Sequence, residues 1–268
     1  MRTPEISFHR SRLPHLCFIV AAALFLGTAA FVAATNMIAD QPNQDIWQHV
    51  AALNALMDNL AHPANPFVAS DETSRHFHPL WVATAAFAQA FGLSVWTALH
   101  LVTYLSMGLF AGAVYSFART YFASPWAPLV LLVTLLFGWM IPVQHTGVHA
   151  FKSLLFGAAY PATFLISFSL ILWAVVMHAL EQRKWLVVVV FLVALMFATH
   201  QLGAVIGLIG AGCFILLWPG AGLAARVAVS LAVLCGLGLS LFWPYYNPFL
   251  FVFQSGGAHG IGAQIIMV

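Results

Sequence analysis

The stretch Leu16–Ala34, LCFIVAAALFLGTAAFVAA, decides the fold class, because it carries no charge and is almost long enough to cross a bilayer. About 20 apolar residues, each rising about 1.5 Å in a helix, span a hydrocarbon core of roughly 30 Å. Similar blocks fill the chain, which is 62% hydrophobic and 6% charged, whereas a soluble domain has about 25% charged residues. The apolar residues are continuous rather than alternating as in a membrane barrel. The sequence therefore predicts an all-α integral membrane protein.

The uncharged blocks predict a polytopic bundle of about seven to nine spans. The candidate spans are 15–37, 77–91, 95–118, 127–141, 154–179, 185–200, 202–218 and 224–243, with a further apolar segment at 248–268. Three of these blocks are short for a full crossing, namely 77–91, 127–141 and 185–200. They are expected to tilt, to include polar flanking residues in the span, or not to cross completely. The chain is expected to divide into an N-terminal segment 1–14, a first span 15–37, a loop 38–76 and a bundle 77–268.

Basic residues set the expected orientation. Three arginines precede the first span: Arg2, Arg10 and Arg12. Lys and Arg gather on the cytoplasmic side, so we expect the N-terminus in the cytoplasm and the loop 38–76 outside. The same pattern fits a cleavable signal sequence, although we expect an uncleaved anchor. Strict alternation would place Arg183 and Lys184 outside, so segment 127–141 is expected to be re-entrant.

The loop 38–76 is the main polar feature of the chain. It contains five of the seven acidic residues, namely Asp40, Asp45, Asp58, Asp71 and Glu72. From Asp45 to Leu60, apolar residues recur every three or four positions, which predicts an amphipathic helix lying in the membrane interface. Asp45 starts this helix, and His49 follows one turn later on the same face. The pair is either a helix cap with a neighbouring histidine or a functional pair, which binds a divalent cation such as Mg or Mn or acts as base and partner.

A second polar segment leads into the next apolar block. Pro79 is tolerated in the first turn of a helix, so Arg75, His76 and His78 are expected at the membrane surface. There they would contact an anionic headgroup or a sugar hydroxyl. The alternative is a solvated polar rim with Trp81 as an interfacial anchor.

Histidines in or beside the apolar blocks give a rival signal. These are His100, His145, His149, His178 and His200. Buried imidazoles ligate haem iron or chlorophyll magnesium. However, His178 and His200 fall at the ends of candidate spans, where imidazoles form hydrogen bonds to headgroups or neighbouring helices. We therefore favour polar packing over a pigment or haem.

Three later motifs extend the pattern of the first loop. They are Ala159-Tyr160-Pro161-Ala162-Thr163-Phe164, Ala198-Thr199-His200-Gln201-Leu202 and Phe242-Trp243-Pro244-Tyr245-Tyr246. Together with the acid after the first span and the interfacial helix, they resemble the GT-C class of polytopic glycosyltransferases. The resemblance implies a polyprenyl-phosphate sugar as donor and a bacterial plasma membrane location. It also implies a catalytic base or metal contact at Asp45 or Asp40, and donor-phosphate contacts at Lys152 and Arg75. An ammonium between apolar blocks, as at Lys152, also calls for an anion or water unless it snorkels to the interface.

The chain also departs from that class, which leaves a second interpretation open. Family members commonly have more spans, whereas this chain resembles an N-terminal half and has no acid between Glu72 and Glu181. It is thus either a transferase or a non-catalytic subunit docked to other membrane chains in a respiratory, photosynthetic or other assembly. Gly203 and Gly207 allow close helix packing, within the chain or against a partner. No basic stripe indicates nucleic acid as a partner.

Overall fold

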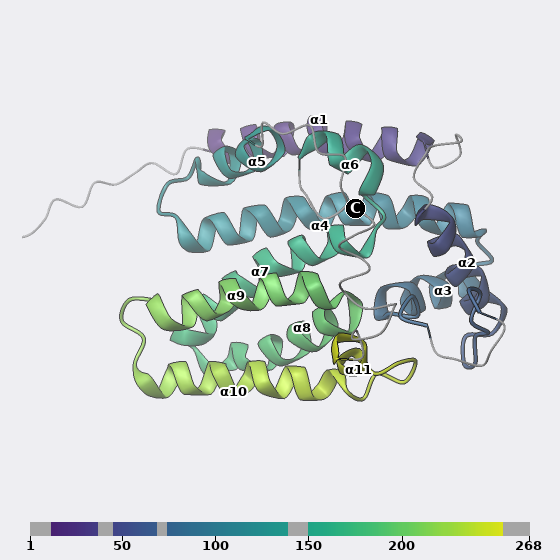
Figure 1. The fold of residues 1–268 in the computed structure, drawn as a ribbon. Helices are drawn as coiled ribbons and strands as arrows, with labels where there is room; N and C mark the ends of the chain where they lie inside the picture. The colour runs from purple at the N-terminus through teal and green to yellow at the C-terminus, as the bar shows by residue number, and fades with distance from the viewer. Residues whose placement is uncertain (1–11, 37–44, 69–73, 139–149, 254–268) are drawn as a thin grey trace, which may run out of the picture.

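The computed structural model describes residues 12–36, 45–68, 74–138 and 150–253, and within these ranges the regular elements are all helices (Figure 1). The α-helices are α1 Leu13–Asn36, α2 Asp45–Asp58, α3 Pro79–Phe91, α4 Val95–Tyr121, α5 Ala127–Phe137, α6 Phe151–Gly157, α7 Pro161–Glu181, α8 Leu186–Thr199, α9 Gln201–Leu217, α10 Leu223–Ser240 and α11 Pro248–Phe253. A short 3-10 helix, η1 Arg183–Trp185, precedes α8. The predicted all-α class is confirmed.

Four of the described helices are long and apolar enough to cross a membrane. They are α1, over Leu13–Thr35, and the whole of α4, α7 and α10. Helices α3, α5 and α9 are apolar but shorter, as is α8 with its 14 residues. The membrane prediction is therefore supported at the level of four candidate spans, while the structure does not establish the predicted seven to nine.

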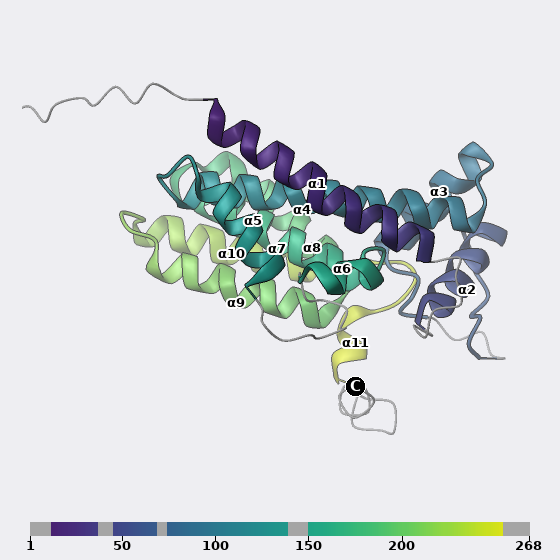
Figure 2. The same ribbon diagram turned by 90° about the horizontal axis from the view of Figure 1, so that it is seen from above.

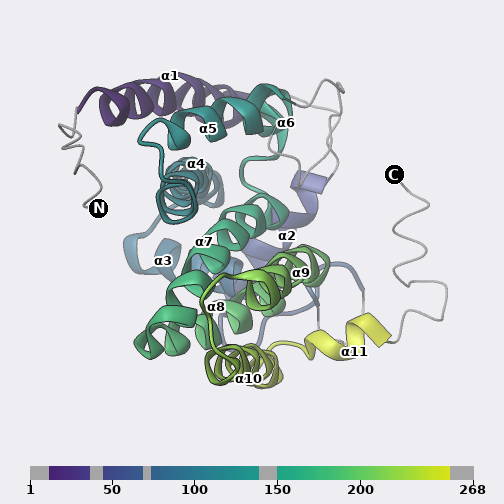
Figure 3. The same ribbon diagram turned by 90° about the vertical axis from the view of Figure 1, so that its left-hand side faces the viewer.

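The long helices form layers around α7. In the end-on view, α1, α5 and α6 lie on one side of α4 and α7, and α8, α9 and α10 lie on the other (Figure 3). One core cluster joins α1, α4, α5, α6 and α7, and a second joins α7 to α8, α9 and α10. Of the four candidate spans, α7 is the most enclosed, with 72% of its apolar window buried. It is the central helix of the bundle.

Helices α2 and α3 lie together at one end of the bundle (Figures 1 and 2). We call this the α2 end, and α1 and α10 finish there while α4 and α7 begin there. The opposite end, the far end, holds the start of α1 and the ends of α4 and α7. The contacts agree, because the Tyr115 hydroxyl lies 2.9 Å from His15 Nδ1, and Thr120 Oγ1 lies 3.3 Å from His178 Nε2.

Two features of the chain path differ from the sequence prediction. The predicted span 154–179 is broken between α6 and α7, where Tyr160 is extended with ψ 146°. The cause is Pro161, because a proline disfavours the helical conformation of the residue before it. In addition, α4 ends at the far end while α7 begins at the α2 end, so the chain between them passes from one end to the other. This does not fit a re-entrant segment 127–141. Because α3 stays at the α2 end, η1 with Arg183 and Lys184 still lies at the same end as the start of α1.

Candidate functional site: a histidine cluster at the α2 end

Five side chains from three separate parts of the chain gather at the α2 end. His49 comes from α2, Arg75, His76 and His78 come from the segment before α3, and His200 separates α8 from α9. Arg75, His76 and His200 all act electrostatically on His49. We call these five residues the histidine cluster. The structure thus brings together four of the predicted site residues, His49, Arg75, His76 and His78, and adds His200 to them.

His49 is the centre of the cluster. Its ring lies 4.9 Å from that of Tyr160, 5.4 Å from that of Trp81 and 5.7 Å from that of His76, measured between ring centroids. The indole N–H of Trp81 donates to His49 Nδ1 at 3.0 Å. This bond ties α2 to α3, whose buried residues also pack together in one apolar core.

His78 caps the N-terminus of α3. Its Nδ1 accepts a hydrogen bond from the backbone N–H of Trp81 at 3.3 Å, and Pro79 occupies the first helical turn as predicted. The prediction that His78 is displayed at the membrane surface is wrong, because only 3% of this residue is exposed. Trp81 is fully buried rather than an interfacial anchor. The reason is that the start of α3 packs against α2 and buries both side chains. The hydropathy of the sequence does not reveal this packing.

His200 caps the next helix in the same way. Its Nδ1 accepts from the backbone N–H of Gly203 at 3.1 Å. Beside it, the Tyr246 hydroxyl donates to the carbonyl of Ala198 and accepts from Gln201 Nε2. The polar ends of two sequence motifs, 198–202 and 242–246, therefore meet next to the cluster.

The segment after α10 also holds the first loop in place. Trp243 Nε1 donates to the carbonyl of Phe77 at 2.9 Å, and the Tyr245 hydroxyl donates to the carbonyl of Leu60 at 2.6 Å. Sequence reasoning did not find the part that His200, Tyr160 and the tyrosines after α10 play here. The available signal was that their three motifs resemble parts of one protein class.

Burial keeps the loop histidines neutral. It lowers the pKa of His49 from 6.5 to about 3, with additional effects of His76, Arg75 and His200. Burial, with Arg75 second, lowers the pKa of His76 from 6.5 to about 4. Burial also lowers the pKa of His78 well below its ordinary value. At neutral pH the imidazoles are therefore uncharged, and Arg75 supplies the positive charge of the cluster.

The predicted metal site at Asp45 and His49 gains no support from this geometry. Among the residues that the structure describes, no three His, Cys, Asp or Glu side chains are placed to hold a metal ion. Asp45 is the first residue of α2, one turn before His49, as predicted. Asp40 lies outside the described residues. The bound indole N–H occupies the lone pair of His49 Nδ1, so a cation cannot bind there.

Lys152, the other predicted phosphate contact, lies apart from the cluster. Its side chain is exposed on α6. Its neighbour Phe151 packs on Phe25, halfway along α1, at 6.4 Å between ring centroids. Of the histidines considered for haem or chlorophyll, His145 and His149 lie outside the described residues. His178 Nε2 lies 3.3 Å from Thr120 Oγ1, and its ring stacks on that of Trp185.

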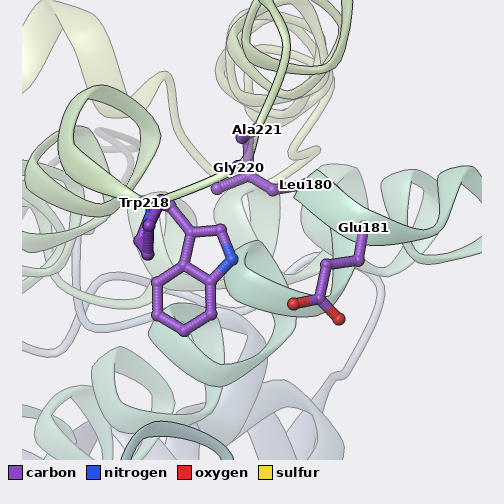
Figure 4. Close-up of a pocket in the computed structure, with 6 residues that line it drawn as sticks. Leu180, Glu181, Trp218, Gly220 and Ala221 are labelled. Atoms are coloured by element: carbon purple, nitrogen blue, oxygen red, sulfur yellow. The ribbon is translucent and has the colours of Figure 1, made fainter. Parts of the chain in front are cut away.

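A separate pocket of about 420 Å³ lies at the far end, between α7 and the turn that joins α9 to α10 (Figure 4). It is lined by Leu180, Glu181, Trp218, Pro219, Gly220 and Ala221. None of the predicted site residues that the structure describes lines it, and Glu181 is the one charged side chain among the described residues of its lining. The histidine cluster is therefore the stronger candidate site. Compared with known proteins, the chain matches no family model, no curated protein and no solved structure.

Proposed function

We propose that this chain is a GT-C-like membrane protein that transfers a sugar from a polyprenyl-phosphate donor at the outer face of the bacterial plasma membrane. One observation carries the proposal. Arg75 and the neutral imidazoles of the histidine cluster are gathered at the α2 end, next to the helix that begins at Asp45. Such a transfer needs a cation and hydrogen-bond donors for the departing phosphate together with a base, and Asp45 is the first residue of the helix that carries His49.

The proposed chemistry divides between the acid and the cluster. The Asp45 carboxylate takes the proton of an acceptor hydroxyl, whose oxygen forms a new bond to the sugar while the bond from the sugar to the phosphate breaks. Arg75 and the imidazole N–H groups stabilise the negative charge that develops on the leaving phosphate. Asp40 is the second candidate for the base.

The distribution of cations supports an orientation with the α2 end outside. Five of the seven Lys and Arg residues in the described ranges belong to the far end: Arg12, Arg119, Arg183, Lys184 and Arg226. Because Lys and Arg concentrate on the cytoplasmic side, this distribution supports a cytoplasmic N-terminus and a histidine cluster at the periplasmic surface. A lipid-linked donor in the outer leaflet would reach the cluster there.

The alternative, a non-catalytic subunit of a larger membrane complex, loses one of its supports. A Cβ at Gly203 would lie 2.8 Å from Leu165, and one at Gly207 would lie 2.7 Å from Ser169. Both glycines therefore serve the packing of α9 on α7 within the chain. They do not form a free face for a partner.

The test replaces the proposed base in the full-length protein. Membranes that contain the full-length chain would be supplied with a polyprenyl-phosphate sugar, and the rate of release of polyprenyl phosphate would be measured. Asp45→Asn is expected to slow release about 100-fold or more, the usual effect of losing a general base. Asp58→Asn, on the exposed last residue of the same helix, is the matched control and should leave the rate unchanged.

Two outcomes would contradict the proposal. If Asp45→Asn and the wild type released polyprenyl phosphate equally fast, Asp45 would not be the base. If the wild-type chain released none and purified only with other membrane chains, the subunit interpretation would hold instead.

A further inference from the structure

Three imidazoles of the histidine cluster share one feature of their hydrogen bonding. His49 accepts at Nδ1 from the Trp81 indole, His78 accepts at Nδ1 from the Trp81 backbone, and His200 accepts at Nδ1 from the Gly203 backbone. All three donors are N–H groups, which cannot accept in return. A neutral imidazole carries one proton, so in each of the three rings that proton is on Nε2.

This tautomer makes the three rings donors toward any ligand. A metal ion binds to the unprotonated ring nitrogen, which in these rings is already occupied. An Nε2–H group instead binds an acceptor, and the best acceptors are anionic oxygens. The rings are therefore suited to an oxyanion and unsuited to a cation.

One of these donors has no acceptor of its own. His78 Nε2 is completely buried and has no hydrogen-bond partner among the described residues. Buried donors are nearly always paired, so an unpaired one indicates a missing acceptor. The acidic side chains that the structure describes do not supply this acceptor, because Asp58 is exposed at the end of α2 and Glu181 lies at the far end.

From this geometry we infer that the histidine cluster is a binding site for a phosphate-type oxyanion, which the neutral Nε2–H groups of His49, His78 and His200 and the guanidinium of Arg75 hold without a metal ion. The inference rests on the proposed function for the source of the anion, a lipid phosphate. The donor set itself follows from the hydrogen bonds. Burial keeps His49 and His78 neutral. Their Nε2–H groups therefore donate at neutral pH without conversion of the rings to the charged imidazolium form.

The direct test is binding by the full-length protein in detergent, with ¹⁵N-labelled histidine. The probes are dodecyl phosphate, inorganic phosphate and Zn²⁺, and the ring ¹⁵N shifts report which nitrogen carries the proton. Before any ligand is added, His49, His78 and His200 are expected to show the Nε2–H form. Dodecyl phosphate should shift their Nε2–H signals, while Zn²⁺ should leave them unchanged.

Substitutions of His78 separate the donor from the side-chain volume. In His78→Gln the amide nitrogen can take the place of Nε2 as a donor, so dodecyl phosphate should bind within about threefold of the wild type. In His78→Met the volume is similar but the donor is lost, and we expect binding at least tenfold weaker. The ¹⁵N signals of His49 show in both variants whether the fold is kept.

Trp81→Phe tests the tautomer itself. It removes the indole N–H and frees His49 Nδ1, so a Nδ1–H form of His49 should appear and Zn²⁺ should begin to shift it. Trp96→Phe, which changes an indole of α4 that contacts α2 through Trp47, is the control and should do neither.

The outcomes assign both the ligand and its source. Binding of dodecyl phosphate but not inorganic phosphate identifies a lipid phosphate, and equal binding of both identifies a free phosphate. If the wild-type rings showed Nδ1–H forms, if Zn²⁺ displaced their protons, or if neither phosphate bound, the inference would be overturned. Phosphate binding together with undiminished sugar transfer by Asp45→Asn would instead overturn the catalytic role proposed for Asp45 and leave the anion site standing.

Discussion

Acidification is expected to loosen the α2 end before the rest of the bundle. The folded protein holds His49 at a pKa of about 3 and His76 at about 4, against 6.5 for a solvated histidine. Below pH 6.5, His49 and His76 bind protons when the α2 end opens, whereas in the folded state they stay unprotonated. The contribution of these histidines is thus complete above about pH 6.5 and is lost as the pH falls toward 4.

The size of the effect follows from the same pKa shifts. One pKa unit corresponds to about 1.4 kcal/mol, and pH 5 lies about 1.5 units below the solvated value. Each histidine therefore costs about 2 kcal/mol at pH 5, and His49 and His76 together cost about 4 kcal/mol. This free energy corresponds to a roughly 1,000-fold increase in the opening of α2.

Hydrogen exchange of the full-length protein in detergent measures this opening. Exchange of α2 amides at pH 7.5 and at pH 5, corrected for the intrinsic rate at each pH, should show the increase, while α10, which contains no histidine, should keep its protection. His76→Gln should remove about 2 kcal/mol of the pH effect, and His62→Gln, an exposed histidine of the same loop, should remove none. Equal protection of α2 at both pH values, or parallel loss in α2 and α10, would refute the reasoning.

Two further predictions concern packing and the far end. A Cβ at Gly210 would lie 2.4 Å from the ring of Trp173, so Gly210→Ala should lower stability by about 1–3 kcal/mol, whereas Gly212→Ala, with nothing within 4 Å, should be neutral or stabilising in the same thermal unfolding assay. Arg226 donates to three backbone carbonyls at the end of α9 and in the turn that follows, so Arg226→Gln should cost about 2 kcal/mol. Arg119→Gln, at an exposed position, should change stability by less than about 0.5 kcal/mol, and equal effects of the two Arg substitutions would contradict the capping role.

Much of the helical layout could be predicted from the sequence, because hydropathy and periodicity act locally. The predicted span 15–37 is α1, and the predicted amphipathic helix is α2, with Asp45 at its start and Leu53 fully buried. The break before α7 was not predicted because the run of apolar residues continues through it. Tyr160-Pro161 was the local signal for that break, since a residue before proline avoids the helical region.

The candidate site was predictable only in part. Arg75 and the three loop histidines stood out as polar residues beside an apolar block. Their burial did not, because it depends on how α2 and α3 close over the start of α7 and the end of α8. His200 lies more than a hundred residues along the chain from them, so only the tertiary fold brings it into the cluster. The same closure buries Trp81, which in sequence is indistinguishable from an interfacial tryptophan.

The chemistry of the site depends on a detail that lies outside any sequence pattern. An aspartate and a histidine one helical turn apart fit a cation site, and the pair Asp45 and His49 has that spacing. Whether the histidine binds a cation or an anion is decided by what occupies its other ring nitrogen. At His49 that group is the indole N–H of a tryptophan 32 residues away in sequence. Because a donor at Nδ1 leaves the ring proton on Nε2, the histidine that the spacing predicts as a metal ligand instead presents an N–H group. Such a group is suited to a phosphate.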